Sequence, residues 1–271
     1  MKYAETIICL AGVALLAYWL LTTSLGRRAL TGSKPRRNCM PVYTPLVPFC
    51  LWFGVSVVAI TVRDLYGDLP DWQSALVDNV VSCLGAVLMA VVIIVLAWAH
   101  FARRLKGFGL GLRALPRDIL TAPLYLLAIW PLIMVAVKLT MDVAQYVSGP
   151  EFQMPRHEQL ELAAQHPQLA LRVLILIGSV IIVPLFEELM FRGLIQTTVR
   201  SFLLTANGAW VAIGLSSGFF AIMHEDPAHW PALFILGACM GYAYEKSGSL
   251  WRPFFIHAIF NGTNIIATMS N

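Results

Sequence analysis

Two adjacent carboxylates and an arginine interrupt an apolar stretch of the chain that runs from Phe186 to Gly193. If this stretch is helical, Glu188 and Arg192 are four residues apart and share one face, so they can form an ion pair. Glu187 points about 100° away from Glu188 and is left unpaired. An unpaired carboxylate in apolar surroundings suits general-base catalysis, although these residues could equally form a structural ion-pair network between two helices.

His224 ends the next apolar segment, and the pair Asn207-Gly208 between the two segments is typical of a turn. Glu187 precedes Asn207 by 20 residues and His224 follows it by 17. Similar distances from the turn of an antiparallel hairpin mean similar depth, here within about one helical turn or 5 Å. We therefore expect Glu187 and His224 to meet, although a single histidine in a membrane helix is often only a hydrogen-bonded packing residue.

A third polar pair, His257 and Asn261, follows in the last apolar segment. The two side chains are four residues apart and project from one face of a helix. Aimed together, they could stabilise an oxyanion or bind an ion. A polar clamp between helices is the structural alternative.

Two glycine-containing patterns lie between these polar groups. Residues 214–218 read G-L-S-S-G and satisfy the G-x-S-x-G pattern, but that motif acts on a strand-turn-helix elbow, and this segment is predicted to be a membrane helix. A serine peptidase using Ser216 or Ser217 with a histidine stays as an alternative. Residues 237–241 read G-A-C-M-G, a spacing that permits close packing of helices.

The composition places all of these residues in a membrane protein. Hydrophobic residues make up 58% of the 271 residues and charged residues only 13%, against about 25% in soluble domains. The formal net charge of +4 could suggest nucleic acid, but the basic residues flank apolar runs, as the positive-inside bias requires. We therefore expect lipid contact and no nucleic-acid partner. The five cysteines form no disulfide or metal-binding pattern.

Apolar runs of about 20 residues predict the membrane spans. The first run has no cleavage site of a signal peptide and is long enough to span. Residues 1–271 are expected to form a single all-α multi-pass domain with about eight transmembrane helices around a polar intramembrane cavity. Pro184 should kink or split the fifth helix. The predicted spans are residues 4–25, 42–62, 78–100, 118–138, 171–204, 208–224, 231–246 and 253–269.

The distribution of Lys and Arg favours both termini on the outer side, because 14 of the 19 then fall on the cytoplasmic side. This count includes Arg192, Arg200 and Arg252. This arrangement creates a conflict between two residues that should share one site. His257 lies five residues after Arg252 and therefore about 8 Å from the cytoplasmic face, whereas a straight helix would place Glu187 about 30 Å from the same face. The sequence therefore leaves open which membrane face the cavity opens on.

In this order on successive helices, the three motifs resemble the CPBP or Abi family. This family includes the type II CAAX prenyl endopeptidase, which is the Ras-converting enzyme, and bacteriocin-immunity relatives. The motifs are Glu187-Glu188-x-x-x-Arg192, Phe220-x-x-x-His224 and His257-x-x-x-Asn261. The resemblance covers roughly residues 181–264 within a core at 171–269, and residues 1–140 show no comparable signature.

The resemblance implies an intramembrane endopeptidase with about eight helices that hydrolyses a peptide bond by a glutamate-activated water. Carried over to this chain, Glu187 would be the base and His224 its partner in activating water. Glu188 and Arg192 would orient the site. His257 and Asn261 would stabilise the oxyanion.

No cofactor is favoured, although Glu187, His224 and His257 could hold zinc with an open position. The expected substrate is a peptide or a lipidated protein, possible targets being prenylated CAAX peptides or other membrane-associated peptides. The expected location is the prokaryotic plasma membrane. Two alternatives stay open. One is a proton-coupled transporter, although the restriction of the polar residues to the last third of the chain argues against it. The other is a non-catalytic immunity or binding protein.

Overall fold

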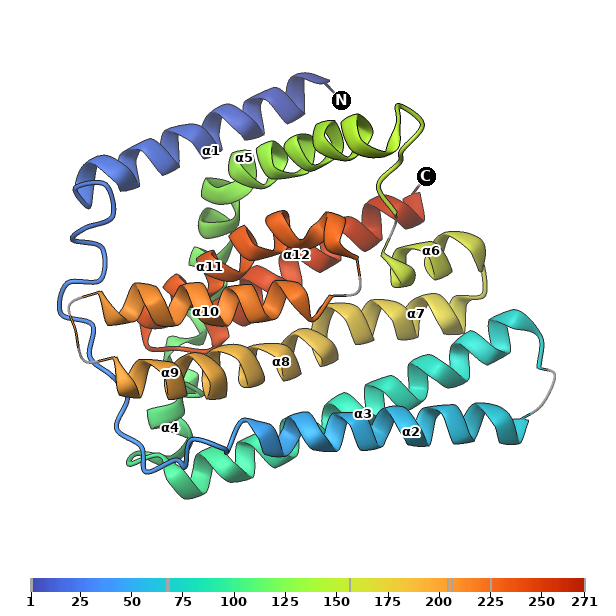
Figure 1. Cartoon of the computed structure of the whole chain (residues 1–271), viewed down its shortest axis with the longest axis horizontal. Coiled ribbons are helices and arrows are strands. Elements are labelled where there is room, and N and C mark those ends of the chain that lie inside the picture. The colour runs from blue at the N-terminus through green and yellow to red at the C-terminus, as the bar shows by residue number, and fades with distance from the viewer. Residues whose placement is uncertain are drawn as a thin grey trace.

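The chain folds into a bundle of helices that run roughly side by side (Figure 1). This computed structural model describes residues 2–66, 69–155, 157–203, 205, 207–224 and 226–270. Within these ranges there is no strand, only an isolated bridge between Asn38 and Phe101. The longer helices are α1 (Lys2–Thr22), α2 (Leu46–Tyr66), α3 (Asp71–His100), α5 (Leu115–Ser148), α7 (Leu169–Ile177), α10 (Gly208–Ile222), α11 (Trp230–Ser247) and α12 (Trp251–Ser270). The shorter ones are α4 (Arg104–Phe108), α6 (Glu158–Gln165), α8 (Val183–Glu188) and α9 (Thr197–Phe202).

Five helical segments in the described ranges are long and apolar enough to cross a membrane. They are Glu5–Thr22, Leu46–Arg63, Asp71–His100, Leu112–Ser148 and Leu169–Phe202, and α10 is apolar but shorter. The expectation of an all-α multi-pass membrane protein is therefore confirmed. All eight predicted segments contain a helix, but the count of eight membrane crossings stays a prediction. The main difference in length is α5, which continues ten residues beyond the predicted end at residue 138.

The motif-bearing helices lie in the middle of the bundle. The Leu169–Phe202 segment contacts α3, α10, α11 and α12, while α11 and α12 pack against α5. Both termini lie at one end of the molecule, and α4 and the α1–α2 connection lie at the other (Figure 1). Buried residues of α3 and α5, such as Ile93 and Leu126, belong to the same hydrophobic core as Leu189 and Met240. The N-terminal helices therefore support the motif helices directly.

The Leu169–Phe202 segment stays helical throughout, but two stretches of it, Gly178–Ile182 and Leu189–Gln196, are π-helical. The sequence predicted that Pro184 kinks or splits this helix, and the segment is not split at Pro184. Proline lacks the N–H that an α-helix needs, and the wider π turn directly before it absorbs the disturbance. The carboxylates Glu187 and Glu188 lie between the two π-helical stretches, in α8.

The start of α12 lies inside the protein, which corrects the assignment of Arg252 to the membrane face. Arg252 is 4% exposed and pairs with Asp118 of α5, their Nη2 and Oδ1 atoms being 2.8 Å apart. Ahead of it, Leu250 N–H donates to the carbonyl oxygen of Gly109. Arg192 and Arg200 are buried as well. His257 Nε2 lies 3.6 Å from Glu187 Oε2, so the two residues lie at the same depth and the conflict in the sequence disappears.

Candidate active site

The predicted pair of Glu188 and Arg192 is formed and buried. Arg192 Nη1 lies 2.8 Å from Glu188 Oε1, and both side chains are 1% exposed. The guanidinium also donates through Nη2 to the carbonyl oxygen of Gly237 and lies 4.6 Å from the centre of the Phe220 ring. A buried charge needs such partners, because desolvation without them costs several kcal/mol. Glu188 is thereby neutralised and anchored, as the four-residue spacing predicted.

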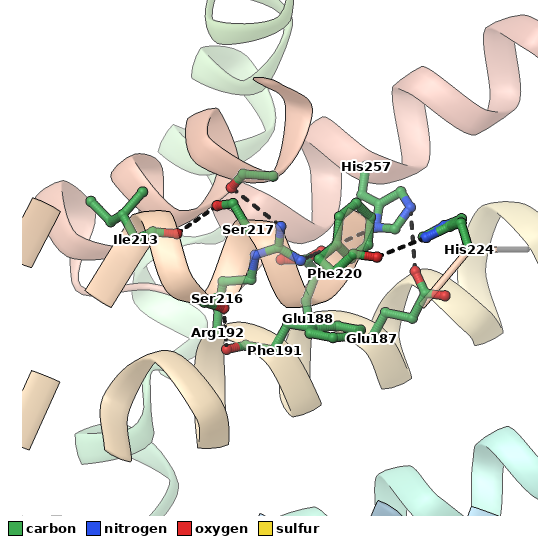
Figure 2. A network of polar contacts seen from close by, with 11 residues as sticks. Glu187, Glu188, Phe191, Arg192, Ile213, Ser216, Ser217, Phe220, His224 and His257 are labelled. Atoms are coloured by element: carbon green, nitrogen blue, oxygen red, sulfur yellow. Dashed lines mark hydrogen bonds and ion pairs between the residues drawn. The ribbon is translucent and has the colours of Figure 1, made fainter. Parts of the chain in front are cut away.

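His257 of α12 lies between the two carboxylates (Figure 2). Its Nδ1–H donates to Glu188 Oε1 over 3.0 Å, and its Nε2 atom lies 3.6 Å from Glu187 Oε2. Glu187 is the more open of the two glutamates, with 18% of its side chain exposed against 1% for Glu188. One carboxylate is thus locked in the core, while its neighbour keeps an accessible edge.

These contacts form a chain of four ionisable groups in the order Arg192, Glu188, His257 and Glu187. With both ring nitrogens of His257 protonated, the chain holds two positive and two negative charges. Such a balance suits a low-dielectric interior, where each charge needs an opposite partner. His257 therefore lies next to both carboxylates, a position that the sequence did not single out.

His224 follows the last turn of α10, and its ring orientation is fixed by the backbone. Its Nδ1 lies 2.8 Å from the carbonyl oxygen of Phe220, so Nδ1–H is the donor in the neutral ring and Nε2 is left as an acceptor. The Phe220 ring makes edge contacts with the imidazoles of both His224 and His257. In the described ranges, no hydrogen bond or ion pair joins His224 to Glu187. The structure brings them to one side of Phe220 without direct contact (Figure 2).

Asn261 points to a different partner, the carbonyl oxygen of Ser179 in the first π-helical stretch, which accepts from Nδ2 over 2.9 Å. In the π register of this stretch, the Ser179 oxygen would accept from the N–H of residue 184. Val183 N–H goes to the Gly178 oxygen, and Pro184, the next residue in the π register, has no N–H. Asn261 therefore satisfies a backbone group that Pro184 leaves unpaired, about two helical turns before Glu187.

The two serines of the G-x-S-x-G pattern are used by the backbone. Ser216 donates to the carbonyl oxygen of Phe191 and Ser217 to that of Ile213, and both are 1% exposed. This arrangement gives neither hydroxyl a histidine partner or access to a substrate. In the G-A-C-M-G pattern, Gly237 lies against Ser217 and Phe220, where a Cβ atom would come within 3.1–3.3 Å of them. The prediction of close helix packing is confirmed.

Two buried polar contacts were missed in the sequence. Arg252 donates to both Asp118 and Tyr125, which fixes the start of α12 on α5. Gln196, one turn after Arg192, donates to the carbonyl oxygen of Gly241 as Arg192 does to that of Gly237. The available signal was the presence of polar residues inside apolar segments, which marks them as paired.

No group of three His, Cys, Asp or Glu side chains in the described part of the chain is arranged to hold a metal ion. The three residues proposed as zinc ligands, Glu187, His224 and His257, do not form such a set. The residues themselves supply a partly exposed carboxylate, that of Glu187, and an imidazole acceptor, Nε2 of His224.

The comparison with known families agrees with the motifs. Residues 169–263 match the family model described as Rce1-like, the type II CAAX prenyl endopeptidase Rce1-like family. This range contains every candidate site residue and confirms the resemblance to the CPBP or Abi family. No curated protein and no solved structure matches the chain.

Proposed function

Because residues 169–263 form an Rce1-like region, we propose that the chain is a membrane endopeptidase that cleaves peptide bonds with a water molecule activated by Glu187 and His224. The observation that carries the proposal is the difference between the two adjacent glutamates. Glu188 is buried against Arg192, whereas Glu187 lies 3.6 Å from His257 Nε2 and keeps 18% of its side chain exposed. A structural ion-pair network alone would not need a second, accessible carboxylate.

In the proposed reaction, water lies between the Glu187 carboxylate and Nε2 of His224. Glu187 accepts a proton as the water oxygen attacks the carbonyl carbon of the peptide bond. His224 Nε2 accepts a hydrogen bond from the same water, since its Nδ1–H is committed to the Phe220 oxygen. The attack produces a tetrahedral oxyanion, and the proton stays on Glu187.

The intermediate then collapses when the bond between carbon and nitrogen breaks and Glu187 returns its proton to the leaving amine. Asn261 is proposed to donate its second amide hydrogen to the oxyanion, while the Ser179 carbonyl fixes the orientation of the amide group. His257 lies between the two carboxylates, with Nε2 near Glu187 and Nδ1 near Glu188, and as a cation it would balance part of their negative charge. Glu188 and Arg192 hold this histidine in place.

For the membrane arrangement, we propose that α10, α11 and α12 complete eight crossings together with the five long apolar segments. The polar residues of the site then lie in an intramembrane cavity. The proposed location is a prokaryotic plasma membrane, and the proposed substrates are membrane-associated peptides or lipidated proteins.

The test is cleavage of a peptide library, including farnesylated CAAX peptides, by purified protein and its Glu187→Gln variant. Glu151→Gln serves as the matched control, because Glu151 is an exposed glutamate outside the site. The proposal expects product from the wild type and the control but not from Glu187→Gln. Equal cleavage by all three would indicate a contaminating peptidase. Absence of product from folded wild type would favour a binding protein, or a transporter if liposomes showed solute flux.

A further inference from the structure

The two ends of the helix bundle carry opposite charge. We call the end formed by the connections 23–45, 101–114, 203–207 and 248–250 the basic end. Its described residues include nine Lys and Arg and no Asp or Glu. The opposite end, formed by the connections 67–70, 149–168 and 223–229, is called the acidic end. Its described residues include four acidic residues, Glu151, Glu158, Glu161 and Asp226, and no Lys or Arg.

Three charged residues of these connections, Asp68, Arg156 and Glu225, lie outside the described residues. By sequence, they add one basic and two acidic residues to the connections of the acidic end, whose net charge stays negative. All these connections are short, the range in which the Lys and Arg bias sets membrane orientation. The basic end therefore faces the cytoplasm.

Toward the basic end, the site is closed by fully buried side chains. Four side chains here are 0% exposed: Leu189, Gln196, Met240 and Tyr244. They lie on the π-helical stretch Leu189–Gln196 and on α11, both of which run from the site toward that end. Beyond them, Phe108 of α4 is also 0% exposed, and its carbonyl oxygen accepts a hydrogen bond from the Tyr244 hydroxyl over 2.8 Å. This packing leaves no room for a peptide.

Gly193 shows how tight the packing at Phe108 is. A Cβ atom at Gly193 would collide with the Phe108 ring. The absence of a side chain is therefore what lets α4 approach the Leu189–Gln196 stretch so closely.

Charged groups hold the connection between α1 and α2 against this closed side of the site. Arg36 donates to the carbonyl oxygen of Tyr244 and lies 3.8 Å from the centre of its ring. Lys246 donates to the oxygen of Ala29 over 2.8 Å, and Ser33 donates to Glu245 over 2.7 Å. These contacts join the α1–α2 connection to the end of α11. The connection therefore covers the buried side chains that close the site.

Toward the acidic end, the site is partly exposed, with 18% of the Glu187 side chain accessible, and α10 is short. Its 15 residues extend about 22 Å, less than the roughly 30 Å of a bilayer core. The α10–α11 turn therefore ends inside the bundle, while α3 and α7 continue beyond it (Figure 1). His224 lies on this turn and is half-exposed, as are Met223 and Asp226. The connection after α5 borders the opening, where Pro155 O contacts His229 Nε2 over 3.0 Å.

From these observations we infer that the site opens toward the acidic, non-cytoplasmic side of the membrane. Its substrates are then peptide segments presented from that side, such as extracytoplasmic parts of membrane-anchored proteins. This inference rests on the proposed peptidase function for its substrate class, whereas the direction of the opening does not. A cytoplasmic prenylated C-terminus would meet the closed side of the molecule.

Cysteine labelling in intact cells tests the direction of the opening without measuring activity. Cys39 is exposed in a connection of the basic end and serves as the cytoplasmic reporter. Met223→Cys reports the site and Glu151→Cys the acidic end, each in a chain whose five native cysteines are replaced by alanine, and a third chain keeps Cys39 as its single cysteine. A membrane-impermeant maleimide should label Met223→Cys and Glu151→Cys in intact cells, and Cys39 only after permeabilisation. Size-exclusion chromatography checks that each variant is folded.

Each other pattern of labelling overturns the inference. If Met223→Cys reacts only after permeabilisation, together with Cys39, the site opens to the cytoplasm. If Met223→Cys reacts under neither condition while Glu151→Cys does, the site is closed toward the acidic end as well.

The substrate class is tested with right-side-out and inside-out vesicles and impermeant peptides. Cleavage outside right-side-out vesicles is expected, at least tenfold faster than with inside-out vesicles, and the reverse ratio would overturn the assignment. Lack of cleavage in both orientations, with the expected labelling, would reject the peptidase function and leave the direction of the opening supported.

Discussion

Asn261 Nδ2 lies 2.9 Å from the main-chain oxygen of Ser179, an oxygen that Pro184 deprives of its helical donor. This contact connects the last helix to a point about two helical turns before Glu187, the proposed catalytic glutamate. It means that Asn261 has a structural task in addition to the proposed oxyanion contact, and the two tasks can be separated by experiment.

We expect Asn261→Ala to lower the free energy of unfolding by about 1–3 kcal/mol, because the Ser179 oxygen loses its partner. In a Pro184→Ala background the loss should shrink, since residue 184 then has an N–H that can donate to Ser179. Activity should stay about 100- to 1000-fold lower in the double variant if Asn261 also stabilises the oxyanion. Thermal unfolding in detergent and peptide cleavage measure the two effects. Equal destabilisation by Asn261→Ala in both backgrounds would contradict its role as a partner of the backbone. Recovery of cleavage in the double variant would contradict its role at the oxyanion.

The two adjacent glutamates should respond differently to the same substitution. Glu187→Gln should reduce kcat/KM by about 100- to 10,000-fold, with little effect on unfolding, because the proposed general base is lost at a partly exposed position. Glu188→Gln should lower the free energy of unfolding by about 3–5 kcal/mol, because the buried Arg192 loses its counter-charge. Thermal unfolding and kinetics of both variants test this contrast. A larger stability loss for Glu187→Gln would reverse the assigned roles.

Asp118 and Arg252 should behave as a buried pair that positions α12. Asp118→Leu alone leaves Arg252 uncompensated and should cost about 3–5 kcal/mol, whereas adding Arg252→Met should restore part of that loss. The exposed pair of Lys138 and Asp142 is the control, and Lys138→Met should cost less than about 1 kcal/mol. Unfolding in detergent measures all three. Strictly additive effects at Asp118 and Arg252 would argue against the pair.

Metal removal should leave cleavage unchanged within about twofold, since the proposed reaction uses only Glu187 and His224 to activate water. The measurement is peptide cleavage after treatment with a strong chelator and subsequent desalting. Loss of activity that is regained with zinc and not with magnesium would instead support the zinc alternative.

Much of the site was readable from the sequence, because its geometry within one helix is local. The four-residue spacing of Glu188 and Arg192 predicted their ion pair, and the different direction of Glu187 followed from the helical repeat. The apolar runs predicted the all-α membrane fold for the same reason: the bilayer sets the length and composition of each span. The Rce1-like match covers the same region as these motifs.

Contacts between helices were not readable in this way. Arg252 looked like a marker of the membrane face until its partner Asp118, 134 residues earlier, was found beside it. Asn261 looked like a partner of His257, but the two side chains contact different groups, Ser179 and the glutamates. The sequence indicates which side chains need a partner at membrane depth and does not say which helix supplies it.

By itself, the sequence determined that this is a multi-pass membrane protein with ionisable residues at three points of its last third, since composition and periodicity depend only on neighbouring residues. Only the tertiary structure decided that His257 lies between Glu187 and Glu188, that His224 contacts the site through Phe220, and that α3 and α7 continue beyond the end of α10 (Figure 1). The physical reason is that buried charges and backbone groups are satisfied by whichever helix packs against them, and packing depends on the whole bundle.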